Sequence, residues 1–280
     1  MTSLPAAVFW ICIGMVAYAY AGYPLLAAWL SRLQGAEPDI RGGRDIPSMT
    51  VIVAAYNEEP RIAARVLDIL AQEYPTDCLH VIVVSDGSSD RTAQAATLDD
   101  PRVRVLSLVA NGGKASALNA AMSMATTELV AFTDARQRYA PGALRALAAA
   151  FADPRVGAAS GELVIEDAAH DQANRGASSQ GVGLYWRMEK RLRSDEARLH
   201  WLHGVSGAVY ALRRELFRAI PAGTILDDMW VPLQVVLADR WVWMARDAVA
   251  YDTASANARE EFGRKLRTLA GNWQLIARLP

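Results

Sequence analysis

Three aspartates in this sequence each follow an apolar, strand-like run at the point where a turn or a helix begins. They are Asp86, Asp134 and Asp228. In an open α/β sheet, ligands bind beyond the carboxyl ends of the strands. Carboxylates delivered to that edge can accept hydrogen bonds, hold a divalent cation or act as a general base. We therefore expect the three side chains to share one polar site.

The neighbours of two of these aspartates refine the chemistry. Asp227 and Asp228 are adjacent, and repulsion between two carboxylates can raise the pKa of one toward the value that a general base needs. The same pair would also suit the cap of a helix over residues 229–237. An Asp-x-Asp would bind a hard cation, but the third position of the motif that starts at Asp134 is Arg136.

Two further segments are typical of phosphate and nucleotide binding. Lys114 follows Gly112-Gly113, as in a phosphate-binding loop, although the Ser or Thr of the Walker pattern is missing after it. A Gly-Gly turn that exposes a solvated lysine explains the same residues. Asp86 precedes Gly87, which allows a tight turn, and its carboxylate can accept hydrogen bonds from a base or a ribose.

The apolar periodicity predicts alternating strands and helices. Predicted strands cover residues 50–55, 79–84, 102–108, 128–133, 156–165, 205–212 and 241–250, and predicted helices residues 61–73, 115–125, 141–151, 184–200 and 257–279. This order predicts an α/β fold with a mainly parallel, twisted sheet and helices on both faces.

Residues 4–30 carry no charged side chain and are long enough to cross a bilayer as a helix. A cleaved signal peptide and a buried helix of a soluble domain are the alternatives. Arg32, Arg41 and Arg44 follow the segment, so the positive-inside rule places the N-terminus outside the inner (cell) membrane and the rest in the cytoplasm.

Four parts of the chain are predicted from these patterns. They are a transmembrane anchor over residues 1–32, a linker over 33–48, a catalytic domain over 49–256 and an amphipathic helix over 257–280. The last helix repeats large apolar residues at helical spacing beside basic residues, which suits an interfacial position on an anionic membrane. A helix that simply packs on the domain is the alternative.

Composition limits the partners. The 280 residues are 52% hydrophobic, with 29 Lys+Arg against 30 Asp+Glu. Global charge therefore gives no basis for a nucleic-acid partner. Cys12 lies in the apolar run and Cys78 outside it, so we expect no disulfide and a reducing compartment.

Together, these segments resemble the family-2 glycosyltransferases, in particular the membrane-bound, inverting enzymes related to the cellulose, chitin, hyaluronan and poly-N-acetylglucosamine synthases. The resemblance covers residues 49 to about 273 and rests on five individually weak motifs in the family's order and spacing. The first is the polar turn Tyr56-Asn57-Glu58-Glu59 after the apolar run of residues 51–55, and the other four are those at Asp86, Lys114, Asp134 and Asp227-Asp228. It implies a GT-A fold that moves a sugar from a nucleotide-diphosphate donor to a polysaccharide or lipid acceptor at the cytoplasmic membrane face. A UDP-sugar is the expected donor.

The resemblance also implies roles for single residues. The donor-binding residues would be Ala55, Tyr56, Glu58, Asp86, Lys114, Asp134, Arg136 and Arg267. Asp86 would hold the base, and Lys114 would lie near the diphosphate or ribose. Asp228 would be the general base that deprotonates the acceptor hydroxyl for in-line attack on the anomeric carbon.

Two departures from the family pattern bear on the metal and the acceptor. Arg136 replaces the second carboxylate of the Asp-x-Asp, which leaves Asp134 as the one metal residue and the use of Mg²⁺ or Mn²⁺ open. One hypothesis is that the Arg136 guanidinium supplies positive charge that a metal would otherwise give the diphosphate. The Gln-x-x-Arg-Trp motif has a counterpart only in Arg267, which weakens a processive interpretation.

The end of the sequence and an alternative function complete the expectations. Related synthases continue with more transmembrane helices, so we expect either a fragment or an enzyme that glycosylates a lipid. A catalytically inactive regulator or partner subunit that binds a nucleotide sugar is the alternative function, favoured by Arg136. Retention of Asp86, Lys114, Asp228 and Arg267 argues against it.

Overall fold

The structure is a computed structural model that describes residues 4–40, 46–166, 177–253 and 258–278, with side chains described outside 177–185 and 258–261. Its contacts divide the chain into two units. One comprises Met1–Glu37 with Gln172–Leu202, and the other Pro38–Asp171 with His203–Pro280. The predicted boundaries at residues 32, 48 and 256 stay predictions.

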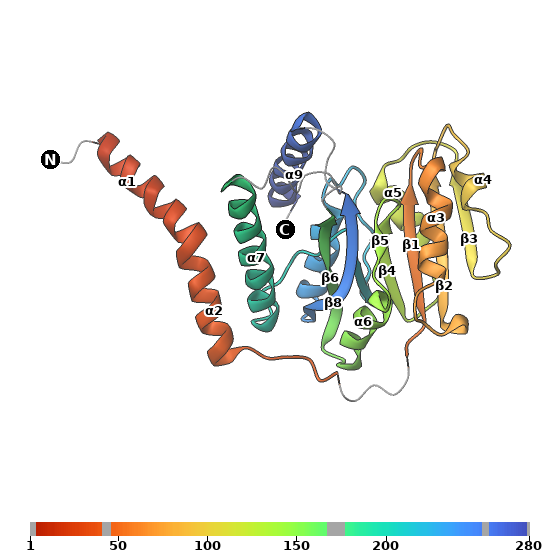
Figure 1. The fold of residues 1–280 in the computed structure, drawn as a ribbon, viewed down its shortest axis with the longest axis horizontal. Coiled ribbons are helices and arrows are strands. Elements are labelled where there is room, and N and C mark those ends of the chain that lie inside the picture. Colours follow the sequence, from red (N-terminus) through yellow and green to blue (C-terminus); the bar gives the residue numbers. More distant parts are fainter. Residues whose placement is uncertain (1–3, 41–45, 167–176, 254–257, 279–280) are drawn as a thin grey trace. The chain divides into compact units, whose positions relative to one another are not determined.

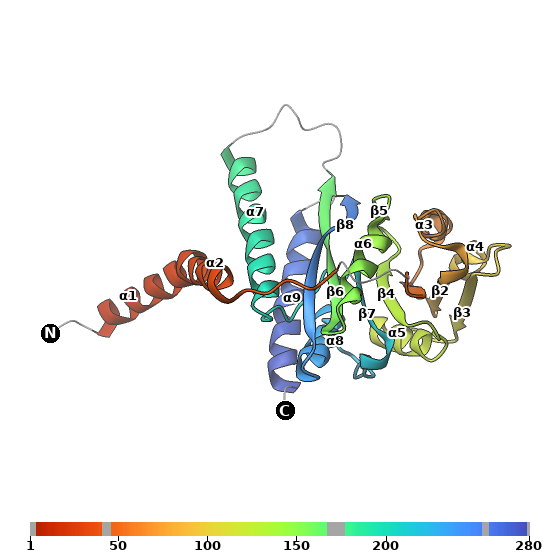
Figure 2. The same cartoon turned by 90° about the horizontal axis from the view of Figure 1, so that it is seen from below.

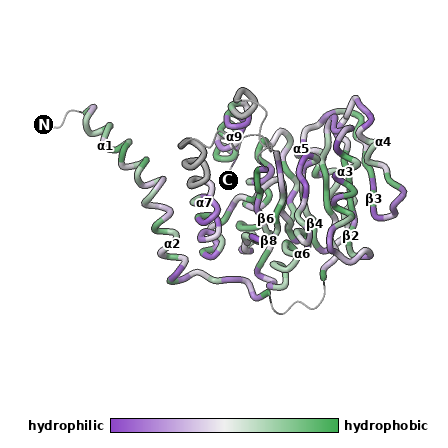
Figure 3. Tube along the Cα trace, viewed as in Figure 1, coloured by the Kyte–Doolittle hydropathy of each residue, from purple (hydrophilic) through white to green (hydrophobic). Residues whose placement is uncertain are grey.

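An apolar helix begins the first unit. Its parts are α1 (Leu4–Ala17), a π-helical turn (Tyr18–Gly22) and α2 (Tyr23–Gln34). Together they form the single helix in the described residues that is long and apolar enough to cross a membrane, and Figure 3 shows α1 as mostly hydrophobic. In the π turn, the Tyr23 N–H bonds to the Tyr18 carbonyl, five residues earlier. Pro24, which has no N–H to donate, follows directly.

Helix α7 (Ala177–Arg198) packs against α2 within this unit. The Tyr23 hydroxyl donates to Glu196 at 2.7 Å, and the Ser31 hydroxyl donates to Asp195 at 2.8 Å. These bonds join the C-terminal part of α7 to α2.

A mixed eight-stranded sheet in the order β3-β2-β1-β4-β7-β6-β8-β5 lies at the centre of the second unit (Figure 1). Its strands are β1 (Met49–Ala55), β2 (Leu79–Asp86), β3 (Val103–Leu108), β4 (Leu129–Asp134), β5 (Arg138–Tyr139), β6 (Val156–Glu166), β7 (Tyr210–Arg213) and β8 (Trp241–Thr253). Strands β3, β2, β1 and β4 run parallel, as do β6 and β8. Strand β7 is antiparallel to both neighbours and β5 is antiparallel to β8. The sheet is therefore mixed: β7 and β5 run against the direction that the other six strands share.

Helices cover both faces of this sheet (Figure 2). They are α3 (Glu59–Leu70), α4 (Thr92–Ala96) and α6 (Ala143–Ala149) on one face, and α5 (Lys114–Met122) and α8 (Asp227–Leu237) on the other. Strand β1 is buried along almost its whole length, which explains its unbroken apolar run. Helix α9 (Ala258–Arg278) follows β8.

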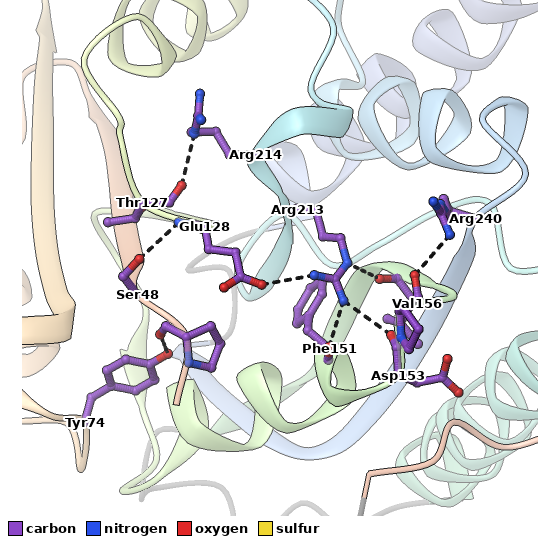
Figure 4. A network of polar contacts seen from close by, with 12 residues as sticks. Ser48, Tyr74, Thr127, Glu128, Phe151, Asp153, Val156, Arg213, Arg214 and Arg240 are labelled. Atoms are coloured by element: carbon purple, nitrogen blue, oxygen red, sulfur yellow. Dashed lines mark hydrogen bonds and ion pairs between the residues drawn. The ribbon is translucent and has the colours of Figure 1, made fainter. Parts of the chain in front are cut away.

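Arg213, the last residue of β7, joins the loops at one end of the sheet (Figure 4). Its guanidinium donates to the carbonyls of Val156 at 3.0 Å and Phe151 at 2.7 Å, and to the Glu128 carboxylate at 3.1 Å. The side chain is only 15% exposed. A four-residue strand is thereby held between two longer ones.

We predict that Arg213→Met lowers the free energy of unfolding by roughly 2–4 kcal/mol, because it leaves buried carbonyls without a charged donor. Urea denaturation in detergent measures the change. As a control, Arg104→Gln on an exposed position of β3 should change it by less than about 0.5 kcal/mol. Equal losses in the two variants would contradict the role of Arg213.

Candidate active site

The ends of three parallel strands and the start of one helix meet at one edge of the sheet. Ala55 lies beside Ser85, and Ala54 beside Asp134, so β2, β1 and β4 end level with one another. Because β7 is antiparallel to β4, the loop before β7 reaches the same edge. The first turn of α8 lies beside this loop, because the N–H of Val205 in the loop donates to the Asp228 carbonyl at 3.0 Å.

Lys114 lies between two carboxylates at this edge. It is the first residue of α5, and its Nζ lies 3.0 Å from Asp134 and 3.2 Å from Asp227. Burial opposes the charged ammonium, but the attraction of the two carboxylates outweighs it and raises the pKa of Lys114. The solvated-lysine interpretation is therefore wrong: Lys114 is a fixed cation that joins the end of β4 to the start of α8.

Asp228 is the carboxylate whose ionisation is most perturbed toward neutral pH. Burial, and then the negative charge of Asp227, raise its pKa to about 6, although Lys114 opposes the shift. Its side chain lies against Gly207, where a Cβ would come within 3.3 Å of Oδ2. A carboxylate with this pKa is a weak acid near neutral pH and a competent proton acceptor.

Asp86 links the end of β2 to the loop before α5. Its Oδ1 accepts from the Gly112 N–H at 2.9 Å, and its carbonyl accepts from the Asn111 side chain at 3.1 Å. Gly87 has a φ of 64°, and a Cβ there would lie 2.3 Å from the Asn111 nitrogen, so this approach requires glycine. Oδ2 of Asp86 makes no hydrogen bond to the described residues and can accept one from a ligand.

The segment after β1 is connected to the loop after β2. Asn57, at a φ of 55°, accepts from the Ser89 N–H at 2.9 Å, while the Glu58 N–H donates to Thr92 at 2.8 Å. Ala55 is buried, and Tyr56 is 52% exposed. Of the three predicted donor-binding residues in this segment, Ala55, Tyr56 and Glu58, Tyr56 therefore has the side chain most accessible to a ligand.

The last two predicted donor-binding residues, Arg136 and Arg267, make no ion pair or hydrogen bond with the described residues that hold Lys114. Arg136 lies 3.9 Å from Asp252, which also accepts from Gln137 at 2.9 Å. Arg267 is exposed on α9 and makes no hydrogen bond or ion pair with the described residues. Their roles at a donor stay predictions.

Asp227 and Tyr210 at the Lys114 cluster, and Asp252 beside Arg136, are absent from the predicted set of binding and catalytic residues. Asp227 holds Lys114, and Asp252 meets Arg136 near the end of β8, where an apolar run precedes an aspartate just as it precedes the other three. Tyr210 is fully buried, and burial together with the three carboxylates Asp134, Asp227 and Asp228 raises its pKa well above the usual value. No pattern in the sequence marks Tyr210 as a site residue. It belongs to the site because the fold places β7 beside β4.

The described residues offer few side chains that could bind a metal ion together. Among the residues that the structure describes, no three His, Cys, Asp or Glu side chains cluster as metal ligands. Mg²⁺ commonly takes only one or two carboxylates and completes its shell with substrate phosphates and water. Asp134 fits that mode as a single protein ligand.

Comparisons with known proteins connect this geometry to a family. The sequence profile of Glycosyl transferase family 2 matches residues 50–220. An N-acetylglucosaminyltransferase of Rhizobium sp. (strain N33) is 32% identical over 160 residues, 56% of this chain and 36% of that protein. The succinoglycan biosynthesis protein ExoO of Rhizobium meliloti (strain 1021) is 34% identical over 123 residues, 44% of this chain and 33% of that protein. The chain thus spans about a third of these relatives.

A solved structure is similar over nearly the whole chain. The mannosyltransferase PcManGT from Pyrobaculum calidifontis, in complex with GDP-Man and Mn²⁺, superposes with a TM-score of 0.75 at 27% identity. The match covers 96% of this chain and 76% of that one. The two chains therefore share a fold that holds a nucleotide sugar in the relative.

The raised pKa of Asp228 should be visible in stability. A carboxyl whose folded pKa exceeds its unfolded value contributes stability at low pH that is lost as pH rises through the folded pKa. We therefore expect Asp228→Asn to gain stability relative to the wild type between about pH 4 and pH 6.5, reaching roughly 2–3 kcal/mol above pH 7.

Urea denaturation at pH 4.5, 6 and 8 measures this difference. Asp247→Asn, an exposed carboxylate on β8, is the matched control and should show no such pH-dependent gain. A pH-independent difference between the wild type and Asp228→Asn would show that Asp228 titrates normally.

Proposed function

The chain belongs to glycosyl transferase family 2, and from that premise we propose that it is an inverting enzyme that moves a sugar from a nucleotide-diphosphate donor to a polysaccharide or lipid acceptor. The observation that carries the proposal is Asp228, partly buried at the carboxyl edge of the sheet with a raised pKa, beside the pair of Lys114 with Asp134. The proposed base and a fixed cation therefore lie at the same edge of the sheet.

In the proposed reaction, Asp228 accepts the proton of an acceptor hydroxyl. The hydroxyl oxygen forms a bond to the anomeric carbon, and the bond from that carbon to the diphosphate breaks on the opposite face. The electron pair leaves with the diphosphate, whose growing charge Lys114 can stabilise because its ammonium is held at the same edge. Attack opposite the leaving group inverts the configuration of the sugar.

UDP-N-acetylglucosamine is the donor that we propose first. Curated relatives carry the name N-acetylglucosaminyltransferase, and the relative ExoO belongs to succinoglycan biosynthesis. Asp86 has one carboxylate oxygen available for the base, and exposed Tyr56 can pack against it. GDP-mannose, the ligand of the structural relative, is the competing donor.

A divalent cation is proposed to bind together with the donor. Asp134 would hold it, and Mg²⁺ or Mn²⁺ there would neutralise charge on the diphosphate. The Mn²⁺ in the structural relative supports this. The competing hypothesis assigns the charge to Arg136, but this guanidinium lies near Asp252, and the cation beside Asp134 is Lys114.

We propose that the enzyme works at the cytoplasmic face of the inner membrane, with the N-terminus outside. The apolar helix over Leu4–Gln34 supports an anchor. Helix α9 supports an interfacial contact, because its large apolar side chains are more than half exposed; they are Phe262, Leu266, Leu269, Trp273 and Ile276. The opposite side of α9 contacts the domain, with Gln274 accepting from the Ile225 N–H at 2.9 Å.

Replacing the proposed base tests the reaction. Asp228→Asn should lower the rate of sugar transfer from UDP-N-acetylglucosamine by about 10²–10⁴-fold, the usual contribution of a general base. Donor affinity, measured by thermal shift, should change little. Asp247→Asn should keep wild-type turnover. Donor binding without turnover by the wild type, across nucleotide sugars and lipid extracts, would instead indicate an inactive regulator.

Removing the metal tests the role of Asp134. EDTA should abolish transfer, and Mg²⁺ or Mn²⁺ should restore it. Because Asp134 is a single protein ligand, Mn²⁺ alone should give no thermal shift, whereas Mn²⁺ with donor should exceed donor alone. Turnover that is unchanged in EDTA but lost in Arg136→Gln would favour the Arg136 hypothesis.

A further inference from the structure

A groove in the first unit has no part in the proposed chemistry. It lies between α2 and α7 and encloses about 640 Å³. Tyr20, Leu25 and Trp29 line one side, and Met188 and Leu192 the other. We call it the α2–α7 groove.

The apolar lining of this groove is open in the structure. Tyr20 is 61% exposed, Leu25 70% and Trp29 57%. Residues 20–32 extend about 18 Å along a helix, close to the roughly 15 Å of hydrocarbon in one leaflet. A groove of this length and character matches a lipid chain.

Two cations line the same groove. Arg32, in the last turn of α2, and Arg191 of α7 are both exposed and form no ion pair with the described residues. The one acidic residue of the lining, Asp195, accepts the Ser31 hydroxyl at 2.8 Å. The lining therefore carries a net positive charge beside an apolar channel.

We propose that the α2–α7 groove binds a membrane lipid that ends in a phosphate monoester, with its chain along Tyr20 to Trp29 and its phosphate at Arg32 and Arg191. Two guanidinium groups suit such a headgroup, because a monoester carries close to two negative charges and accepts forked hydrogen bonds. The phosphodiester of a bulk lipid carries only one charge. The inference rests on the proposed insertion of Leu4–Gln34 in a bilayer.

The test is lipid binding by the full chain. In detergent, native mass spectrometry compares phosphatidic acid with phosphatidylglycerol of the same acyl chains. Phosphatidic acid should bind at least about tenfold more tightly, and Arg32→Gln and Arg191→Gln should each lower its affinity by about tenfold or more. Arg187→Gln, an exposed arginine of α7 outside the lining, is the matched control and should bind like the wild type.

Each other outcome overturns the inference. Equal binding of the two lipids would mean that the groove holds bulk lipid. An equal loss of affinity in Arg187→Gln would mean that the net charge of the protein, and not the groove, determines binding. Dimers that dissociate on adding lipid, without headgroup preference, would assign the groove to a second copy. Thermal unfolding verifies that the variants are folded.

A separate flotation assay distinguishes this inference from the proposed function. If the wild type does not float with phosphatidylcholine vesicles, the anchor and the groove site both fail. If it floats but shows no preference for phosphatidic acid, only the groove site fails. Sugar transfer enters neither measurement.

Discussion

The ammonium of Lys114 between Asp134 and Asp227 is the contact on which the carboxyl edge of the sheet depends. Without a cation, the carboxylates of β4 and α8 would repel one another at a partly buried site. The same ammonium opposes the rise in the pKa of Asp228, which burial and Asp227 drive. One lysine thus holds two elements together and tunes the neighbouring carboxylate.

Backbone geometry around this cation is fixed by hydrogen bonds from several elements. Asp86 holds the loop that leads into α5, and thereby positions the start of the helix that carries Lys114. Behind β4, the buried Arg65 donates to the Thr133 hydroxyl at 2.7 Å, and that hydroxyl donates to the Ala208 carbonyl at 2.8 Å. The residue before Asp134 is therefore tied both to α3 and to the loop before β7.

The antiparallel β7 explains how the second half of the chain joins this edge. A further parallel strand at this place would direct its carboxyl end there, whereas β7 brings the loop that precedes it, with Gly207 against Asp228. At the other end of β7, Arg213 secures the strand to the loops beside it. The mixed sheet thus assembles the base and the cation from segments that are more than a hundred residues apart in sequence.

Local patterns in the sequence indicated most strands and helices and the positions of the strand-end aspartates, because burial on both faces and helical periodicity both appear in consecutive residues. They missed the two-residue β5, and the strand predicted over residues 205–212 begins only at Tyr210. They also indicated the family, which the profile match confirms over residues 50–220. Tertiary structure alone decided the direction of β7, the partners of Lys114 and the contact of Arg136 with Asp252. These depend on distances between segments far apart in the chain, and the charge of a residue does not reveal which opposite charge the fold will bring to it.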